Sequence, residues 1–94
     1  MSELIEKSEL KEYLKRVPEW DLEGKKIERL FEFDDFNESI DFVNGVAEIA
    51  EELEHHPDID IRWNKVKLIL STHNKGGLTN LDFELAGKID TLVE

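Results

Sequence analysis

The sequence predicts an α+β fold of two layers, in which a four-stranded antiparallel sheet carries three helices on one face. Three observations support this prediction. The apolar spacing alternates between helical and strand periods, two strand-like stretches fold back as hairpins, and three amphipathic stretches are best buried against one side of the sheet they would form. The expected order is α-β-β-α-β-β-α, within a single domain of residues 1–94.

A short first helix is predicted to begin at the N-cap residue Ser8 and to end at Pro18. Its apolar residues recur at helical spacing: Leu10, Tyr13, Leu14 and Val17. A hairpin is expected next, because Trp20 and Leu22 alternate up to a turn at Gly24. Its second strand alternates apolar and charged residues, with one face formed by Ile27, Arg29, Phe31 and Phe33.

The clearest element is a long second helix, which is expected to begin with a capping box formed by Asp35 and Glu38. Its apolar stripe is expected to contain Phe36, Ile40, Val43, Val46, Ala47, Ala50 and Leu53. Gly45 lies inside this pattern and is interpreted as a helical glycine, at a cost of about 1 kcal/mol relative to alanine. Pro57 disfavours helical geometry at the preceding residue, so the helix is expected to end near His55 and His56.

A second hairpin is predicted from Ile59 to Thr72, with a two-residue turn at Asn64-Lys65 and with His73 at the far end of its second strand. The last helix is expected to begin at the cap Thr79, with Asp82 completing a capping box. Its buried stripe would contain Leu81, Leu85, Ile89 and Leu92, and Leu78 would pack on Phe83.

Charge and composition exclude several functions. Twelve Lys and Arg residues stand against 23 Asp and Glu, and a net charge of -11 repels phosphate backbones, so direct nucleic-acid binding is not expected. The chain has no cysteine for a disulfide or a thiolate metal site, and no apolar run long enough to span a membrane. Its first residues lack the apolar core of a secretory signal, and we therefore expect a cytoplasmic protein.

The three histidines are the strongest candidates for chemistry, because they bracket the second hairpin. His55 and His56 precede the hairpin and His73 ends it, so the return of the chain would bring them together. Glu51 lies one helical turn before His55, where its carboxylate would accept from an imidazole N–H and fix the tautomer. Asp82, in the first turn of the last helix, could approach the same end of the sheet.

Each candidate also has a structural explanation. His55 and His56 could serve to end a helix, Asp82 to cap one, and Trp63 to fill the core. Glu51 belongs to an acidic run that would be a solvated helix face. The three histidines with Glu51 also supply enough ligands for a metal site, although adjacent histidines at a helix end would point apart.

The spacing of these residues resembles the signature of the pterin-4a-carbinolamine dehydratases. Glu51 is followed after three residues by His55-His56-Pro57, after five more by Trp63, after nine by His73 and after eight by Asp82. The surrounding sequence is similar as well, from Trp20 to Ile89.

The resemblance implies dehydration of 4a-hydroxytetrahydropterin to quinonoid dihydropterin, without cofactor or metal. It implies acid and base roles for His55 and His73, substrate binding by His56, orientation of a histidine by Glu51, and a supporting role for Asp82. Further supporting or substrate-binding positions would be Trp20, Pro57, Trp63, Ser71 and Thr72. The pterin would be the small-molecule partner, and the family forms homodimers or homotetramers. Alternatives that the resemblance leaves open are a binding role as a dimerisation cofactor of a transcription factor and a role with another pterin, such as molybdopterin.

Overall fold

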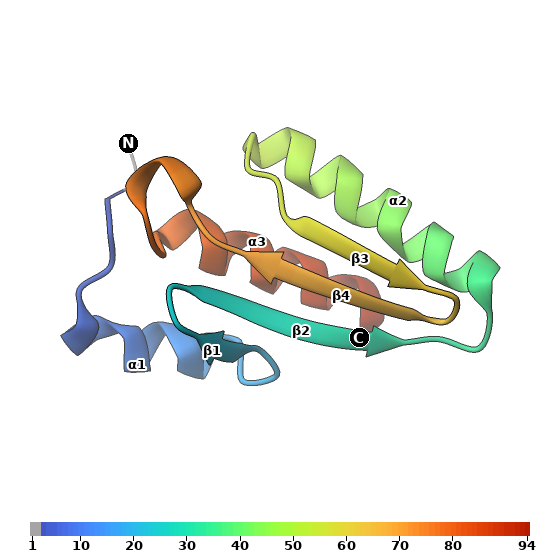
Figure 1. The fold of residues 1–94 in the computed structure, drawn as a ribbon, viewed down its shortest axis with the longest axis horizontal. Helices are drawn as coiled ribbons and strands as arrows, with labels where there is room; N and C mark the ends of the chain where they lie inside the picture. Colours follow the sequence, from blue (N-terminus) through green and yellow to red (C-terminus); the bar gives the residue numbers. More distant parts are fainter. Residues whose placement is uncertain (1–2) are drawn as a thin grey trace.

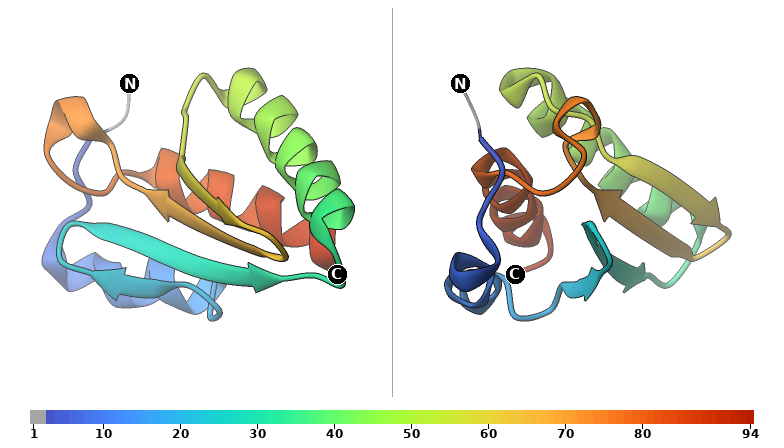
Figure 2. Two further views of the ribbon diagram at one scale, coloured as in Figure 1. Left: turned by 45° about the vertical axis from the view of Figure 1, so that its right-hand side comes forward. Right: turned by 60° about the vertical axis from the view of Figure 1, so that its left-hand side comes forward.

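Four antiparallel strands form one layer of the computed structural model and the helices form the other, as the sequence predicts (Figure 1, Figure 2). The structure describes residues 3–94. The elements follow in the order α1 (Lys7–Arg16), β1 (Asp21–Glu23), β2 (Lys26–Glu32), α2 (Phe36–Leu53), β3 (Asp58–Arg62), β4 (Lys65–Leu70), the 3-10 helix η1 (His73–Lys75), α3 (Asn80–Asp90) and the 3-10 helix η2 (Thr91–Val93). None of the helices in this part of the chain is both long and apolar enough to cross a lipid bilayer.

The strand order is β1-β2-β4-β3, so β4 lies inside the sheet and β3 lies at one edge. Alternate side chains of the two central strands form the buried face: Ile27, Phe31, Val66, Leu68 and Leu70. The helices cover this face, and the ring centroid of Phe42 in α2 lies 4.6 Å from that of Phe31. Between the helices, the Tyr13 ring of α1 lies 5.1 Å from the Phe83 ring of α3.

Two details of the helices differ from expectation. Helix α1 begins at Lys7 after Glu6, whose side chain makes no cap hydrogen bond, so Ser8 lies inside the helix. The buried face of α2 is rotated relative to the predicted stripe: Ser39 and Phe42 are buried, whereas Phe36 and Ala47 are exposed. The rotation is possible because the Ser39 hydroxyl donates to the Asp35 carbonyl, which lets a polar residue face the core.

Helix α2 ends at Leu53, two residues earlier than predicted. Glu54 takes the left-handed conformation with φ 51°, and its N–H still donates to the carbonyls of Ala50 and Glu51. His55 and His56 therefore lie outside the helix. Pro57 restricts the backbone of only the residue before it, so the proline predicts the end of the helix only to within a few residues.

The turn of the second hairpin is Trp63-Asn64, not Asn64-Lys65, because Arg62 and Lys65 are paired in the register. Asn64 is held at the end of β2, where its Nδ2 donates to the Phe33 carbonyl over 3.0 Å and its own carbonyl accepts from the Phe33 N–H. Trp63 takes the left-handed position instead, with φ 54°. Its side chain is 67% exposed, so the interpretation of Trp63 as a core aromatic is wrong.

Helix α3 confirms the predicted capping box, with the Asp82 carboxylate accepting from the Thr79 N–H over 2.9 Å. Gly45 is helical, as predicted, and a Cβ there would lie 3.2 Å from a Leu92 methyl group. Its lack of a side chain lets the C-terminal segment pack on α2. Leu92 itself is 43% exposed, in η2 and beyond the end of α3, so the buried stripe ends at Ile89.

Candidate active site

Three segments meet at one end of the sheet, because the pairing of the strands places them there. Asp58, at the start of β3, pairs with Ile69 near the end of β4, and Ile27, near the start of β2, pairs with Leu70. The residues before β3, those after β4 and the turn between β1 and β2 therefore share that end (Figure 1). The strand register therefore confirms the predicted approach of His55 and His56 to the end of β4.

His55 and Asp82 form a buried pair at this end of the sheet. The distance from His55 Nε2 to Asp82 Oδ1 is 2.6 Å, the imidazole side chain is 10% exposed and the carboxylate is fully buried. The other carboxylate oxygen, Oδ2, accepts from the Thr72 hydroxyl over 2.8 Å and from the Thr79 N–H over 2.9 Å. Asp82, the N3 residue of the α3 capping box, is thus also the partner of a histidine.

The hydrogen bonds around Asp82 fix the direction of each proton. An ionised carboxylate only accepts, so Thr72 and His55 Nε2 both donate to it. The Thr72 hydroxyl has no second proton, so it accepts from the Thr79 hydroxyl, 2.8 Å away. The Thr79 oxygen in turn accepts from the Leu81 N–H. This chain of donors ends at the Asp82 carboxylate, and the uncharged His55 ring is held in the Nε2–H tautomer.

In this tautomer the second ring nitrogen of His55, Nδ1, carries no proton, and its lone pair can accept one. It makes no hydrogen bond to the described residues, in which no buried side-chain nitrogen or oxygen lacks a partner. Nδ1 must therefore reach the surface. Asp82 stabilises the imidazolium that would form when this nitrogen takes a proton.

Glu51 binds the other histidine of the pair. Its carboxylate lies 2.5 Å from His56 Nε2, and both side chains are well exposed, at 75% and 62%. The expectation that Glu51 orients His55 is wrong, because α2 ends before the next helical turn and Glu54 reverses the chain direction. Orientation of His55 comes from Asp82 instead.

His73 opens η1 and does not end a strand, because β4 stops at Leu70. Its side chain is exposed and makes no hydrogen bond to the described residues. It lines a cavity of about 440 Å³ together with Ser71, Gly76 and Gly77 from the same loop, with Lys25 from the turn before β2 and with Lys26 from the start of β2. The sequence gives no signal for a role of these lysines, because adjacent lysines at a turn are typical of any solvated surface.

Two of the predicted site residues lie elsewhere. Trp20 is buried, and its Nε1–H donates over 2.9 Å to Asp90, at the opposite end of α3 from Asp82. Trp63 lies in the hairpin turn at the far end of β3. The remaining predicted residues share the end of the sheet described above: Glu51, His55, His56, Pro57, Ser71, Thr72, His73 and Asp82.

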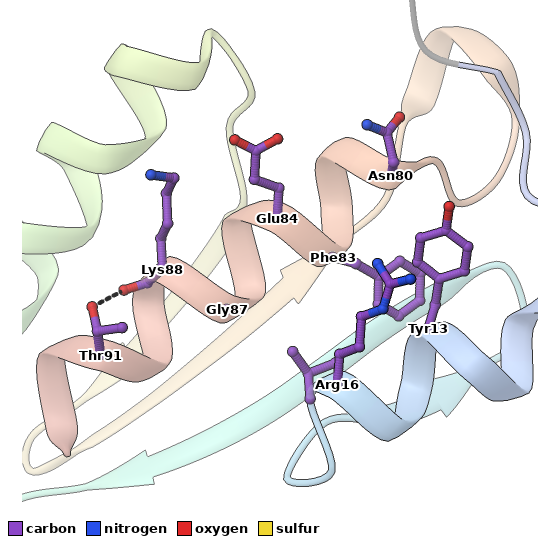
Figure 3. Close-up of a pocket in the computed structure, with 9 residues that line it drawn as sticks. Tyr13, Arg16, Asn80, Phe83, Glu84, Gly87, Lys88 and Thr91 are labelled. Carbon is purple, nitrogen blue, oxygen red and sulfur yellow. Dashed lines mark hydrogen bonds between the residues drawn. The ribbon is translucent and has the colours of Figure 1, made fainter.

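A larger cavity, of about 560 Å³, lies between α1 and α3 but contains no histidine (Figure 3). The Arg16 guanidinium covers the Tyr13 ring at 4.6 Å, and Phe83 packs beside it. Thr91 uses its hydroxyl to donate to the Lys88 carbonyl. These contacts are internal packing, so we place the candidate active site at the histidines. Within residues 3–94, no group of three or more His, Cys, Asp or Glu side chains is arranged to hold a metal ion.

Comparison with known proteins points to one family. The family model for "Pterin 4 alpha carbinolamine dehydratase" matches residues 3–92. A protein of Acidobacterium capsulatum named "Putative pterin-4-alpha-carbinolamine dehydratase" is 50% identical over 93 residues, which cover 99% of this chain and 100% of that protein. A protein of Sulfurisphaera tokodaii with the same name is 48% identical over 99% of each chain.

A solved structure is similar in fold along nearly the whole chain. The crystal structure of a "transcriptional coactivator/pterin dehydratase" from Brucella melitensis matches with a TM-score of 0.91 and 33% sequence identity, and the match covers 97% of this chain and 99% of that one. The family match, the identity over full length and the shared fold agree with one another. The chain therefore belongs to the pterin 4 alpha carbinolamine dehydratase family.

Proposed function

We propose that this protein dehydrates 4a-hydroxytetrahydropterin to quinonoid dihydropterin, using histidines as acid and base. The observation that carries the proposal is the buried pair of His55 and Asp82, which presents a lone-pair nitrogen toward the surface. Membership of the family supports the substrate class. The exposed His56 and His73 supply further imidazoles at the same end of the sheet.

The reaction needs one proton delivered and one removed. The bond from ring carbon 4a to the hydroxyl oxygen breaks, and the oxygen keeps the electron pair and takes a proton to leave as water. The neighbouring ring nitrogen gives its lone pair to a new C=N bond and loses its proton. Imidazole can perform either transfer near neutral pH, and each such transfer is worth about 10²- to 10⁴-fold in rate.

We assign the base to His55 and the acid to His73. A base must accept a proton and carry the resulting charge, and His55 Nδ1 is the acceptor of a ring whose positive form Asp82 stabilises. An acid must be free to approach the leaving hydroxyl, and the His73 side chain is exposed without an internal hydrogen bond. His56, with Glu51, would hold the pterin ring.

The test is the rate at which purified protein removes 4a-hydroxytetrahydropterin, compared with the uncatalysed reaction in the same buffer. We expect a first-order acceleration proportional to enzyme concentration. A folded protein that leaves the spontaneous rate unchanged would overturn the proposal and favour a binding role instead.

Chelators are expected to leave this activity unchanged. The proposed mechanism moves protons only and routes no step through a metal. Activity should be measured after dialysis against EDTA and again after addition of Zn²⁺ or Mg²⁺, with metal content determined in parallel. A stoichiometric metal whose removal abolishes turnover would contradict this prediction.

Glu51→Ala is expected to cost little activity, because the Glu51–His56 pair is exposed and His56 keeps its ring in place. Exposed ion pairs contribute at most about 1 kcal/mol, which corresponds to about fivefold in rate. The measurement is kcat/KM of the variant relative to the wild type. A loss beyond about 100-fold would give Glu51 a direct part in the chemistry.

We also propose that the chain forms a homodimer or homotetramer. Strand β3 is an edge strand whose five residues are all exposed, including Ile59 and Ile61, and Trp63 extends the apolar surface at its tip. Unpaired strand edges of this kind favour pairing with another chain. Light scattering at micromolar concentration should give a mass at least twice 11.0 kDa. A monomer under these conditions would be contrary to the prediction.

A further inference from the structure

The cavity beside His73 differs in charge from the rest of this acidic protein. Its wall contains Lys25, Lys26 and His73 and no carboxylate. Four other cavities each have at least one Asp or Glu in the wall: Glu84 in the first, Glu38 and Asp41 in the second, Glu32 in the third, and Glu19, Asp90 and Glu94 in the fourth. A wall with two lysines and no carboxylate, in a chain of net charge -11, is therefore a local departure from the composition.

Neither Lys25 nor Lys26 forms a salt bridge with any described residue, whereas Lys67 and Arg29 on the same sheet do. Glu23 is the cross-strand partner of Lys26 in the hairpin register, but their side chains form no salt bridge. An anion that enters this cavity meets two ammonium groups free to bind it.

The cavity is held in shape by the loop that follows β4. The Thr72 N–H donates to the Gly77 carbonyl over 2.8 Å, and the Gly76 N–H donates to the carbonyls of Thr72 and His73. Gly76 has φ 73°, a conformation that glycine adopts without strain. Since these amides are engaged, recognition falls to the lysines and to the Ser71 hydroxyl, which makes no hydrogen bond to the described residues.

We propose that this cavity binds an anionic group, a phosphate or a carboxylate, carried on the side chain of the pterin that reacts at His73. This inference rests on the proposed function and specifies its substrate class. Because His73, Lys25 and Lys26 line one cavity, the side chain of a pterin placed against His73 can reach both lysines. Lysine binds such anions as a point charge and needs no fixed geometry, which suits a side chain that leaves the ring flexibly.

The experiment compares two 4a-hydroxytetrahydropterins that differ only in a phosphate ester on the side chain. The wild type is expected to have a KM at least about tenfold lower for the phosphorylated substrate. The double variant Lys25→Ala/Lys26→Ala should lose this preference and keep its KM for the neutral substrate. The matched control is Lys7→Ala/Lys11→Ala, which removes the same charge from exposed positions of α1 and should keep the preference.

A binding measurement separates failure of this inference from failure of the proposed function. Fluorescence titration with oxidised pterins, with and without the phosphate, needs no turnover. If the enzyme is inactive but binds the phosphorylated pterin more tightly through Lys25 and Lys26, the anion site stands and the dehydratase proposal fails. If the enzyme is active and both pterins have equal KM and Kd, the anion site is overturned.

Inorganic phosphate is the second probe. We expect it to raise the KM for the phosphorylated substrate in the wild type and to leave the neutral substrate unaffected. If phosphate alone binds at the two lysines while the pterins show no phosphate preference, the site serves a free anion and the proposed substrate class is wrong.

Discussion

Asp82→Asn is expected to lower kcat by about 10²- to 10⁴-fold while the fold survives. The Thr79 N–H is a backbone donor that cannot turn away, so the amide oxygen of the new side chain must face it and the Thr72 hydroxyl. The amide NH₂ then faces His55 Nε2. That nitrogen has to become an acceptor, and the ring proton moves to Nδ1, so the base is converted into a donor.

Two measurements separate this effect from a general loss of structure. Thermal unfolding should change little, because each hydrogen bond of the network has a counterpart in the variant. The ¹⁵N shifts of the His55 ring should report the exchanged tautomer. As a contrast, Asp82→Ala would leave the Thr79 N–H and the Thr72 hydroxyl buried without an acceptor and should cost about 1 to 3 kcal/mol of stability for each of these two groups. An Asp82→Asn variant with the new tautomer and full turnover would show that His55 is not the base.

The fold was predictable because its elements have strong local signals. The alternation in residues 27–33 and 66–70 placed the inward faces of β2 and β4, and Thr79 with Asp82 marked the start of α3. The errors fall where a distant contact decides between local options. Asn64 could take the left-handed position in a turn, but its hydrogen bonds with Phe33 at the end of β2 leave that position to Trp63.

The site was predictable as a set of residues but not as a set of pairs. The hairpin return brings His55 near the end of β4, which follows from the chain order alone. Its partner could not be read from spacing, because Asp82 already had a sufficient explanation as a cap, and Glu51 stood at the helical distance from His55. The left-handed Glu54 breaks that helical relation, and single-residue backbone reversals of this kind have no marker in the sequence when glycine is absent.

His73→Ala is expected to lower kcat by about 10²-fold or more and to leave KM nearly unchanged. His73 has no structural role to lose: its side chain is exposed, makes no hydrogen bond to the described residues and lies outside the hydrophobic core. If it delivers the proton to the departing hydroxyl, its removal acts in the transition state and not on substrate binding.

The control for His73→Ala is Asn74→Ala, a change at another exposed position of the same 3-10 helix that removes a polar side chain outside the cavity wall. Both variants should unfold at the wild-type temperature, and only His73→Ala should lose turnover. Because the side chain opens to solvent, added imidazole should restore part of the lost rate in His73→Ala and none in Asp82→Asn, where the missing group is buried. Full turnover in folded His73→Ala would show that His73 is not the general acid. Anion binding in the lysine-lined cavity would then be the remaining proposed function of this loop.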